Sequence, residues 1–277
     1  MQGIVKEWMP PLLEAVRKEF EKPTPSWKWE PWSQDDEAYV QQICNNPSSF
    51  GSDAFIKECL AKPVSLTKKK AVSGPVSFLI VAPGPLTIPL GLWFRIVRTL
   101  VPKRSVRVVL FGNPRIREPP KHGQPIEPIH VNGGYTNRCS TRTIVIYRAE
   151  EATRVLIHEL FHGSCSDPSL AIPYLEADTE AWAEIVYCAF MGQGKKDAFL
   201  QRMREQIRYA VSQAEWVRKH HKVEDARAYG WRYLTGRIRV WERLGFAIPS
   251  VGTIYKDQYK SLRLTYADIP AKQVRVE

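Results

Sequence analysis

Apolar residues recur at helical spacing along most of the second half of the chain. After Tyr147 this pattern predicts four helices, over residues 150–162, 173–190, 195–219 and 223–244. Turn signals separate these segments, and a less regular tail follows the last of them. The second half of the chain is therefore predicted to be almost entirely helical.

The middle of the chain has a different pattern. Three runs, VSFLIVA, SVRVVLFG and RTIVIY, are rich in β-branched and aromatic residues and bounded by Gly and Pro, which predicts strands. A helix is expected at 90–101, between the first two strands, and a long proline-rich loop at 113–140 precedes the third. Loops of this length inside a compact domain are often functional. Strands followed by helices indicate an α+β fold.

The first 70 residues have the pattern of a helical region. An amphipathic stretch at 10–20 and two shorter ones at 34–44 and 53–61 predict helices. A segment rich in Pro and Trp, KPTPSWKWEPW, separates the first two, and the basic run KPVSLTKKK after the third is interpreted as a solvated loop. We therefore expect a helical N-terminal region, residues 1–70, and one main domain, residues 71–277.

Composition and charge restrict the kinds of protein that this chain can be. The 277 residues are 44% apolar and 25% charged, as in ordinary globular domains, and the net charge of +11 favours acidic partners such as nucleic acid. The most apolar stretch is broken by prolines, glycines and arginines, so we expect no membrane span. A secretory signal pattern is absent, which favours an intracellular, cytoplasmic setting.

The five cysteines are scattered, odd in number and without a CxxC pair. This usage argues against a disulfide framework and against a cysteine-based zinc site. Cys165 follows the most conspicuous motif of the chain and is interpreted as a small buried residue rather than a regulatory thiol.

That motif lies in the apolar run VLIHELFHGSC, residues 155–165. His158 and His162 are four positions apart, so a helix projects both imidazoles from one face, with Glu159 one step around. Burying these groups without partners would be costly. H-E-x-x-H is the pattern in which two histidines bind zinc and the glutamate acts on water, whereas two core histidines satisfied by neighbours are the alternative. Gly163 predicts the end of the helix.

A catalytic zinc takes three protein ligands and keeps one position for water. The downstream segment IPYLEADTEAWAEIVYCAF offers Glu176, Glu180 and Glu184 at helical spacing on one face. Three like charges in a column repel one another, so the column indicates a nearby cation, with a solvated acidic face as the alternative. His220 and His221 lie far downstream beside lysines and are interpreted as surface residues.

These two motifs together resemble the gluzincin class of zincin metallopeptidases, which have H-E-x-x-H on one helix and a glutamate ligand on the next. TEAWAE is similar to the E-x-x-x-E/D form of that second helix, and the resemblance covers about residues 141–190. It implies a zincin-like α+β fold, in which a small mixed sheet is followed by an active-site helix and a helical C-terminal part. The family binds substrate along the sheet edge before that helix, where HVNGGYTNR, residues 130–138, would lie.

The resemblance also implies a ligand set. Zn²⁺ would be held by His158, His162 and Glu180, and Glu184 would support His158 from behind. A competing register makes Glu176 the third ligand and Glu180 the supporting residue.

The implied activity is hydrolysis of a peptide bond in a peptide or protein substrate. Glu159 would be the general base that takes the proton of the attacking water, and Tyr229 or Tyr233 would donate a hydrogen bond to the oxyanion, as His220 or His221 could. Two alternatives are a catalytically silent zincin-fold scaffold and a basic nucleic-acid-associated binding protein. The intact Glu159 argues against the silent scaffold, which would have no chemical need for that carboxylate.

Overall fold

The computed structural model describes residues 5–46, 52–61, 66–166, 171–250, 261–266 and 274–276. The chain divides into two compact units. Unit 1 comprises Met1–Lys22, Arg117–Val131 and Asp167–Ile269. Unit 2 comprises Pro23–Ile116, Asn132–Ser166 and Pro270–Glu277. The boundary expected near residue 70 falls within unit 2, and much of the expected C-terminal tail lies outside the described residues.

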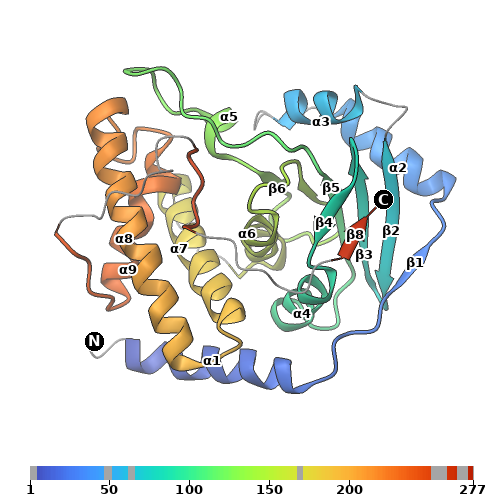
Figure 1. Cartoon of the computed structure of the whole chain (residues 1–277), viewed down its shortest axis with the longest axis horizontal. Coiled ribbons are helices and arrows are strands. Elements are labelled where there is room, and N and C mark those ends of the chain that lie inside the picture. Colours follow the sequence, from blue (N-terminus) through green and yellow to red (C-terminus); the bar gives the residue numbers. More distant parts are fainter. Residues whose placement is uncertain are drawn as a thin grey trace. The chain divides into compact units, whose positions relative to one another are not determined.

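Unit 2 is built on a six-stranded mixed sheet (Figure 1) with the strand order β1-β2-β3-β5-β7-β6. In that order its strands are Lys28–Glu30, Thr67–Ser73, Val76–Ala82, Val106–Phe111, Ile144–Ile146 and Gly134–Thr136. The central strands β3, β5 and β7 pair in parallel and are the three that the sequence predicted. The outer pairs, β1 with β2, β2 with β3 and β6 with β7, are antiparallel, so the sheet is mixed.

Strand β2 corrects the interpretation of the basic run as a solvated loop. It pairs with β3 along its whole length. The amine of Lys68 lies 2.8 Å from the carboxylate of Glu37, and that of Lys70 lies 3.2 Å from Asp36. Both acids belong to α2 (Gln34–Asn45), so the helix neutralises the charges that made this segment resemble a loop.

Helices cover the sheet of unit 2. Residues Phe78 to Ala82 of β3 are each at most 1% exposed, and because successive side chains of a strand point to opposite faces, both faces of the sheet are covered. Helix α3 (Ser52–Leu60) packs on β3 and β5. Helix α4 (Leu90–Leu100) places Trp93 and Phe94 against Phe78. A separate two-stranded ladder joins β4 (Leu86–Ile88) to β8 (Val274–Val276).

Helix α6 (Ala152–Ser164) follows β7 and carries the H-E-x-x-H motif. It packs against β6, β7 and α4, and the indole nitrogen of Trp93 donates to the hydroxyl of Thr153 at 2.8 Å. The predicted stop at Gly163 is wrong, because the helix continues to Ser164. Glycine is needed there for another reason: a Cβ atom would lie only 3.0 Å from the carbonyl oxygen of Ser140.

Unit 1 is helical within its described residues. Its elements are α1 (Val5–Glu21), α5 (Pro128–Val131), α7 (Ile172–Met191), α8 (Lys196–His221), the π-helical turn η2 (Trp231–Thr235) and α9 (Gly236–Arg243). Helix α7 packs against α1, α8, η2 and α9. The helix predicted from residue 223 starts only at Trp231. The predicted N-terminal helices form, but α1 belongs to unit 1 whereas α2 and α3 belong to unit 2.

Candidate metal centre

The two histidines of the motif lie side by side on α6. Their Nε2 atoms are 3.0 Å apart and their ring centroids 4.6 Å apart. The spacing of four residues produces this pairing, because residues i and i+4 share one face of a helix. His158 is buried, and so is Glu159 next to it.

The pairing of ring nitrogens fits a bound transition metal. With Zn–N bonds of about 2.0–2.1 Å and a tetrahedral angle, two imidazole nitrogens are held about 3.3 Å apart. The observed separation of 3.0 Å is close to that value, and both nitrogens are of the type that binds zinc. The two imidazoles thus offer two ligands of a metal site without any change of rotamer.

Glu159 lies on the side of α6 that faces the edge strand β6. A Cβ atom added to Gly134 would lie 3.1 Å from Oε1 of Glu159, 2.7 Å from a methyl of Val155 and 2.8 Å from the carbonyl oxygen of Val145. The strand can pass this close to the helix only because residue 134 has no side chain. The sequence signal for this contact was the NGG of the long loop, although a flexible turn explains such glycines equally well.

The three glutamates of the acidic column differ in their surroundings on α7. Glu180 and Glu184 are buried, at 3% and 0% exposure, whereas Glu176 is partly exposed near the start of the helix. The first turn of α7 is held against η2 by an edge-on contact between Tyr174 and Trp231, whose ring centroids are 5.6 Å apart. A fully solvated acidic face is therefore excluded for this helix.

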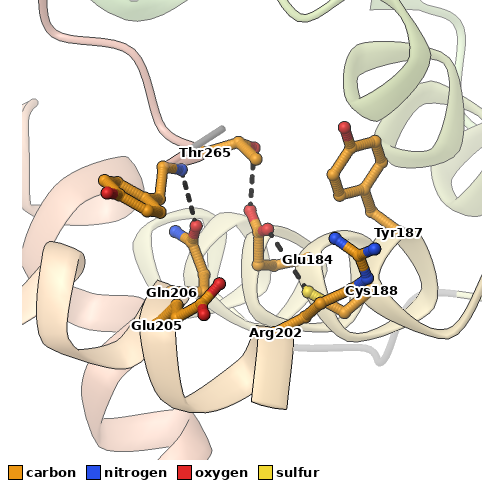
Figure 2. A pocket seen from close by; sticks show the side chains of 8 residues that line it. Glu184, Tyr187, Cys188, Arg202, Glu205, Gln206 and Thr265 are labelled. Atoms are coloured by element: carbon orange, nitrogen blue, oxygen red, sulfur yellow. Dashed lines mark hydrogen bonds between the residues drawn. The ribbon is translucent and has the colours of Figure 1, made fainter. Parts of the chain in front are cut away.

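Glu184 takes part in a buried polar cluster of unit 1 (Figure 2). One carboxylate oxygen accepts a hydrogen bond from Thr265 at 3.1 Å, and the other accepts from the thiol of Cys188 at 3.8 Å. The oxygen that faces Thr265 also lies 3.9 Å from the fully buried guanidinium of Arg237. A small pocket of about 30 Å³ adjoins this cluster, with room for about one water molecule. Glu184 thus has partners of its own within unit 1, and its expected role behind His158 stays a prediction.

The two candidate tyrosines come together on the segment around η2. The hydroxyl oxygens of Tyr229 and Tyr233 are 3.2 Å apart and their ring centroids 5.3 Å apart. Burial raises the pKa of Tyr233 well above its ordinary value, and the negative charges of Glu176 and of an ionised Tyr229 add to this effect. Tyr233 therefore keeps its proton at neutral pH and can donate a hydrogen bond.

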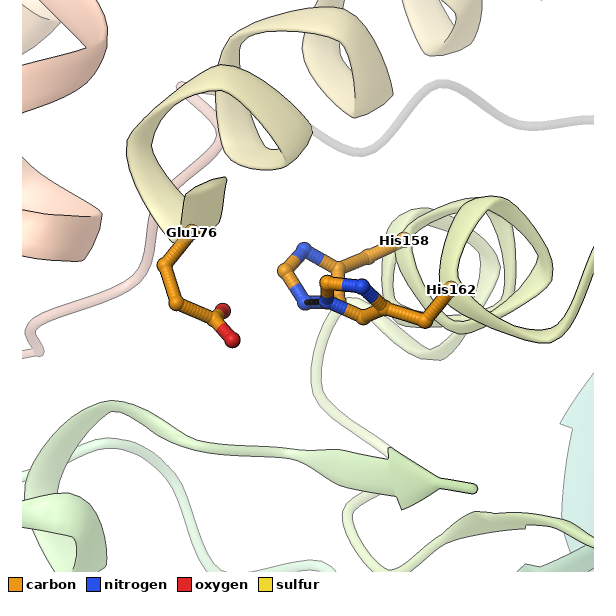
Figure 3. Close-up of side chains that lie close together, drawn as sticks. All are labelled: His158, His162 and Glu176. Atoms are coloured by element: carbon orange, nitrogen blue, oxygen red, sulfur yellow. Dashed lines mark hydrogen bonds between the residues drawn. The ribbon is translucent and has the colours of Figure 1, made fainter. Parts of the chain in front are cut away.

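Among the residues that the structure describes, one set of three side chains has the composition of a metal site: His158, His162 and Glu176 (Figure 3). Each offers one ligand atom, and these atoms lie within 4.8 Å of one another. The set contains Glu176 and not Glu180, the ligand that the resemblance favours. The two histidines belong to unit 2 and the acidic column to unit 1, so the choice between Glu176 and Glu180 as third ligand stays a prediction.

The interpretations of two single residues, His221 and Cys165, are wrong. His221 is 5% exposed rather than on the surface, and its Nδ1 lies 2.9 Å from the carbonyl oxygen of Gln124. Cys165 is exposed rather than buried, and it forms a disulfide with Cys139. The odd number and wide spacing of the cysteines gave no signal for this pair, because only the fold brings residues 26 positions apart together.

No protein-family model, curated protein or solved structure matches the chain in sequence or fold comparisons. A helix able to span a bilayer is absent from the part of the chain that the structure describes.

Proposed function

We propose that this chain is a zinc-dependent peptidase of the gluzincin type. The observation that carries the proposal is the pair of Nε2 atoms of His158 and His162, 3.0 Å apart on a buried helix that also bears Glu159. Two imidazole nitrogens at this separation can bind the same divalent cation, and a glutamate beside them on the helix is the residue type that acts on a metal-bound water. The mixed sheet followed by helices is compatible with the α+β, zincin-like fold that the motif implies.

The proposed ligands are His158, His162 and Glu176. The support for Glu176 is that its carboxylate belongs to the set of ligand atoms within 4.8 Å of one another. Glu180 then follows four residues later on the same face of α7, in the position that supports a histidine ligand in the E-x-x-x-E pattern. In this register Glu176 and Glu180 belong to the proposed metal site, whereas Glu184 takes part only in the buried cluster with Arg237.

Zinc at such a site supplies Lewis-acid chemistry, which makes water a nucleophile near neutral pH and polarises a carbonyl group. Glu159 takes the proton from the attacking water and passes it to the leaving amine. Its carboxylate is suited to this because α6 holds it in place against β6. Tyr233, which stays protonated, donates a hydrogen bond to the oxyanion, and its neighbour Tyr229 orients that hydroxyl.

The proposed substrate is a peptide in extended conformation. Strand β6 is an edge strand of the sheet and is paired with β7 on one side. An extended peptide would add to its other side by main-chain hydrogen bonds and so pass Glu159. The basic composition favours substrates with acidic segments.

The test combines metal content with cleavage. The protein is loaded with Zn²⁺ and freed of excess metal, and the bound zinc is measured together with hydrolysis of labelled casein and of a mixed peptide library. We expect one zinc per chain with measurable cleavage, and retained zinc without cleavage in Glu159→Gln. Zinc content at background in the unaltered protein would refute the proposal.

A matched pair of variants decides the third ligand. Glu176→Gln is expected to lower zinc affinity strongly, because a carboxylate ligand is lost, and Glu180→Gln is expected to lower it about 10- to 100-fold, as the loss of a supporting residue does. The reverse order of the two effects would assign Glu180 as the ligand.

The two alternative functions predict other results. Zinc binding without any cleavage would favour the silent scaffold, and binding of single-stranded DNA by metal-free protein would favour the nucleic-acid-associated alternative.

A further inference from the structure

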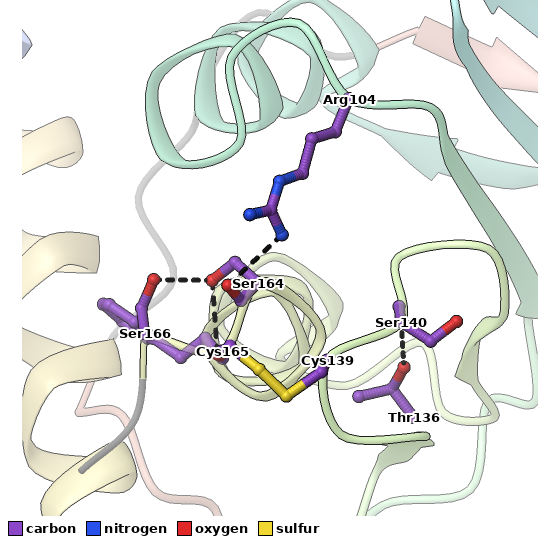
Figure 4. The surroundings of a disulfide bond; sticks show 8 residues. Arg104, Thr136, Cys139, Ser140, Ser164, Cys165 and Ser166 are labelled. Carbon is purple, nitrogen blue, oxygen red and sulfur yellow. Dashed lines mark hydrogen bonds between the residues drawn. A yellow bond between two sulfur atoms is a disulfide. The ribbon is translucent and has the colours of Figure 1, made fainter.

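A disulfide lies directly after the helix that carries the motif (Figure 4). It joins Cys165, the residue that follows α6, to Cys139 in the loop between β6 and β7. Cys165 is three residues beyond His162, so the bond is close in sequence to a proposed metal ligand. The other three cysteines, Cys44, Cys59 and Cys188, are not disulfide-bonded.

The disulfide is the covalent part of a larger contact between the loop and the last turn of α6. The carbonyl oxygen of His162 accepts hydrogen bonds from the amides of both cysteines, at 2.8 Å from Cys139 and 3.2 Å from Cys165. Gly163 packs against the backbone of Ser140. Both ends of the disulfide therefore converge on the backbone of the second histidine of the motif.

The end of α6 has a conformation that its sequence does not favour. The amide of Ser166 donates to the carbonyl of Phe161 and that of Cys165 donates to His162, which is the hydrogen-bond pattern of a Schellman motif. This motif needs a left-handed residue, usually glycine, at the position that Cys165 occupies with φ of 60°. Cys139 is left-handed too, with φ of 64°. The cross-link thus holds two non-glycine residues in a conformation that they would otherwise rarely adopt.

The loop is anchored independently of the disulfide. The hydroxyl of Thr141 donates to the carbonyl of Ser105 at 2.7 Å, and that of Thr136 donates to the carbonyl of Thr143 at 2.8 Å. At the end of α6, the hydroxyl of Ser164 donates to the carbonyl of Phe161 at 3.2 Å and lies 2.7 Å from the hydroxyl of Ser166, but these bonds join residues of the helix end to one another. A bond of 3.3 Å from Arg104 to the carbonyl of Ser164 connects the helix end to another element. Loss of the cross-link would therefore release the helix end rather than the loop.

We propose that Cys139–Cys165 is a redox-reactive site whose reduction by a dithiol loosens the last turn of α6 and weakens metal binding at His162. Both cysteines are exposed, so a dithiol can reach them. One thiolate of the dithiol attacks a sulfur of the pair, the S–S bond breaks, and the second thiolate resolves the mixed disulfide. The products are two cysteine thiols on the chain and an oxidised, cyclic dithiol. The effect on metal binding rests on the proposed function, whereas the loosening of the helix does not.

The first experiment uses metal-free, full-length protein. Hydrogen exchange of residues 160–166 is measured before and after treatment with dithiothreitol, which is removed under argon. We expect at least about tenfold faster exchange after reduction, because the helix end opens locally. Cys139→Ser should exchange at the fast rate in both conditions, and Cys44→Ser, which alters a free cysteine, should respond like the unaltered protein. Equal exchange in the oxidised and reduced protein would overturn the inference.

The second experiment measures zinc affinity of the same samples by competition with a chromophoric chelator. We expect reduction to weaken binding about tenfold, as the loss of a group that orients a ligand does. Equal affinity in both redox states would overturn the proposed effect on the metal. Zinc binding in neither state, combined with the change in exchange, would leave the redox site standing and would refute the proposed peptidase instead.

Discussion

The contact between Gly134 and Glu159 allows one substitution to test the proposed catalytic role of Glu159 separately from the proposed metal site. In Gly134→Ala the new methyl would lie 2.7 Å from a methyl of Val155, 2.8 Å from the carbonyl oxygen of Val145 and 3.1 Å from Oε1 of Glu159. Ordinary contacts of a Cβ atom begin at 3.4 Å, so all three neighbours are too close. The carbonyl of Val145 is fixed within the sheet, so strand β6 or the side chains of α6 must move.

The size of the effect follows from these distances. Extra volume in a well-packed site costs about 1–3 kcal/mol, so we expect the free energy of unfolding to fall by that amount. The carboxylate of Glu159, at 3.1 Å, must move by a few tenths of an ångström, and the contacts with Val155 and Val145, both below 3.0 Å, require a larger shift. Misplacement of a catalytic group by up to about 1 Å can cost about 100-fold in rate, so peptide cleavage should fall by one to two orders of magnitude. His158 and His162 are not among the groups that the methyl meets, so zinc content should stay at the level of the unaltered protein.

Three measurements test this prediction: urea denaturation, bound zinc per chain and hydrolysis of labelled casein. The matched control is Gly84→Ala in the same unit, where a Cβ atom would meet nothing within 4 Å. That control should match the unaltered protein in all three. Full activity and stability in Gly134→Ala would refute the close approach of β6 to Glu159, and parallel loss of zinc and cleavage would refute the separation of the two roles.

The remaining predictions concern the start of α2 and the tyrosine pair. Ser33→Ala removes a capping box and should lower the free energy of unfolding by about 1 kcal/mol in urea denaturation. Burial raises the pKa of Asp36, but hydrogen bonds from Ser33 and Lys70 outweigh it and hold that pKa below its ordinary value. The carboxylate thus stabilises the fold above the unfolded pKa, and this contribution is lost as pH falls through the lower folded pKa. Asp36→Asn should therefore be destabilised at pH 7, with a smaller difference from the unaltered protein in urea midpoints at pH 3. Tyr233→Phe removes the proposed donor to the oxyanion and should lower kcat by about 100- to 1,000-fold with KM little changed. An equal rise in KM would argue against oxyanion stabilisation.

The spacing of apolar residues is enough to predict those helices and strands whose burial follows a regular pattern along the chain. Strand β3 is buried on both faces, so its sequence is a continuous apolar run, VSFLIVA, and was recognisable as such. The ends of helices α4, α6, α7 and α8 were predicted to within a few residues, because their apolar residues recur at helical spacing. Strand β2 was not predicted, because consecutive lysines are typical of solvent-exposed loops. The ion pairs of Lys68 with Glu37 and of Lys70 with Asp36 explain how these lysines can lie in a strand.

Features that depend on contacts between residues far apart in the sequence could not be predicted from the spacing of apolar residues. Gly163 was read as a helix stop because glycine commonly ends helices, whereas its actual constraint is the backbone of Ser140. The pairing of Cys139 with Cys165 depends on the path of the chain through β7 and α6. The sequence shows the column of acids on α7, but helical spacing alone cannot decide between Glu176 and Glu180 as the third ligand, because both lie on the same face.

The contacts that hold α6 in place suit the three different roles proposed for His158, Glu159 and His162. Successive residues are rotated by about 100° around a helix, so Glu159 points away from the face shared by the two histidines. Glu159 faces the edge strand at Gly134, the start of the helix is held by the bond from Trp93 to Thr153, and its end is held by the disulfide. The proposed base, Glu159, is therefore positioned by β6, and the proposed ligand His162 by the helix end. A substitution in β6 should therefore lower peptide cleavage more than zinc affinity. Reduction of the disulfide at the helix end should lower zinc affinity first.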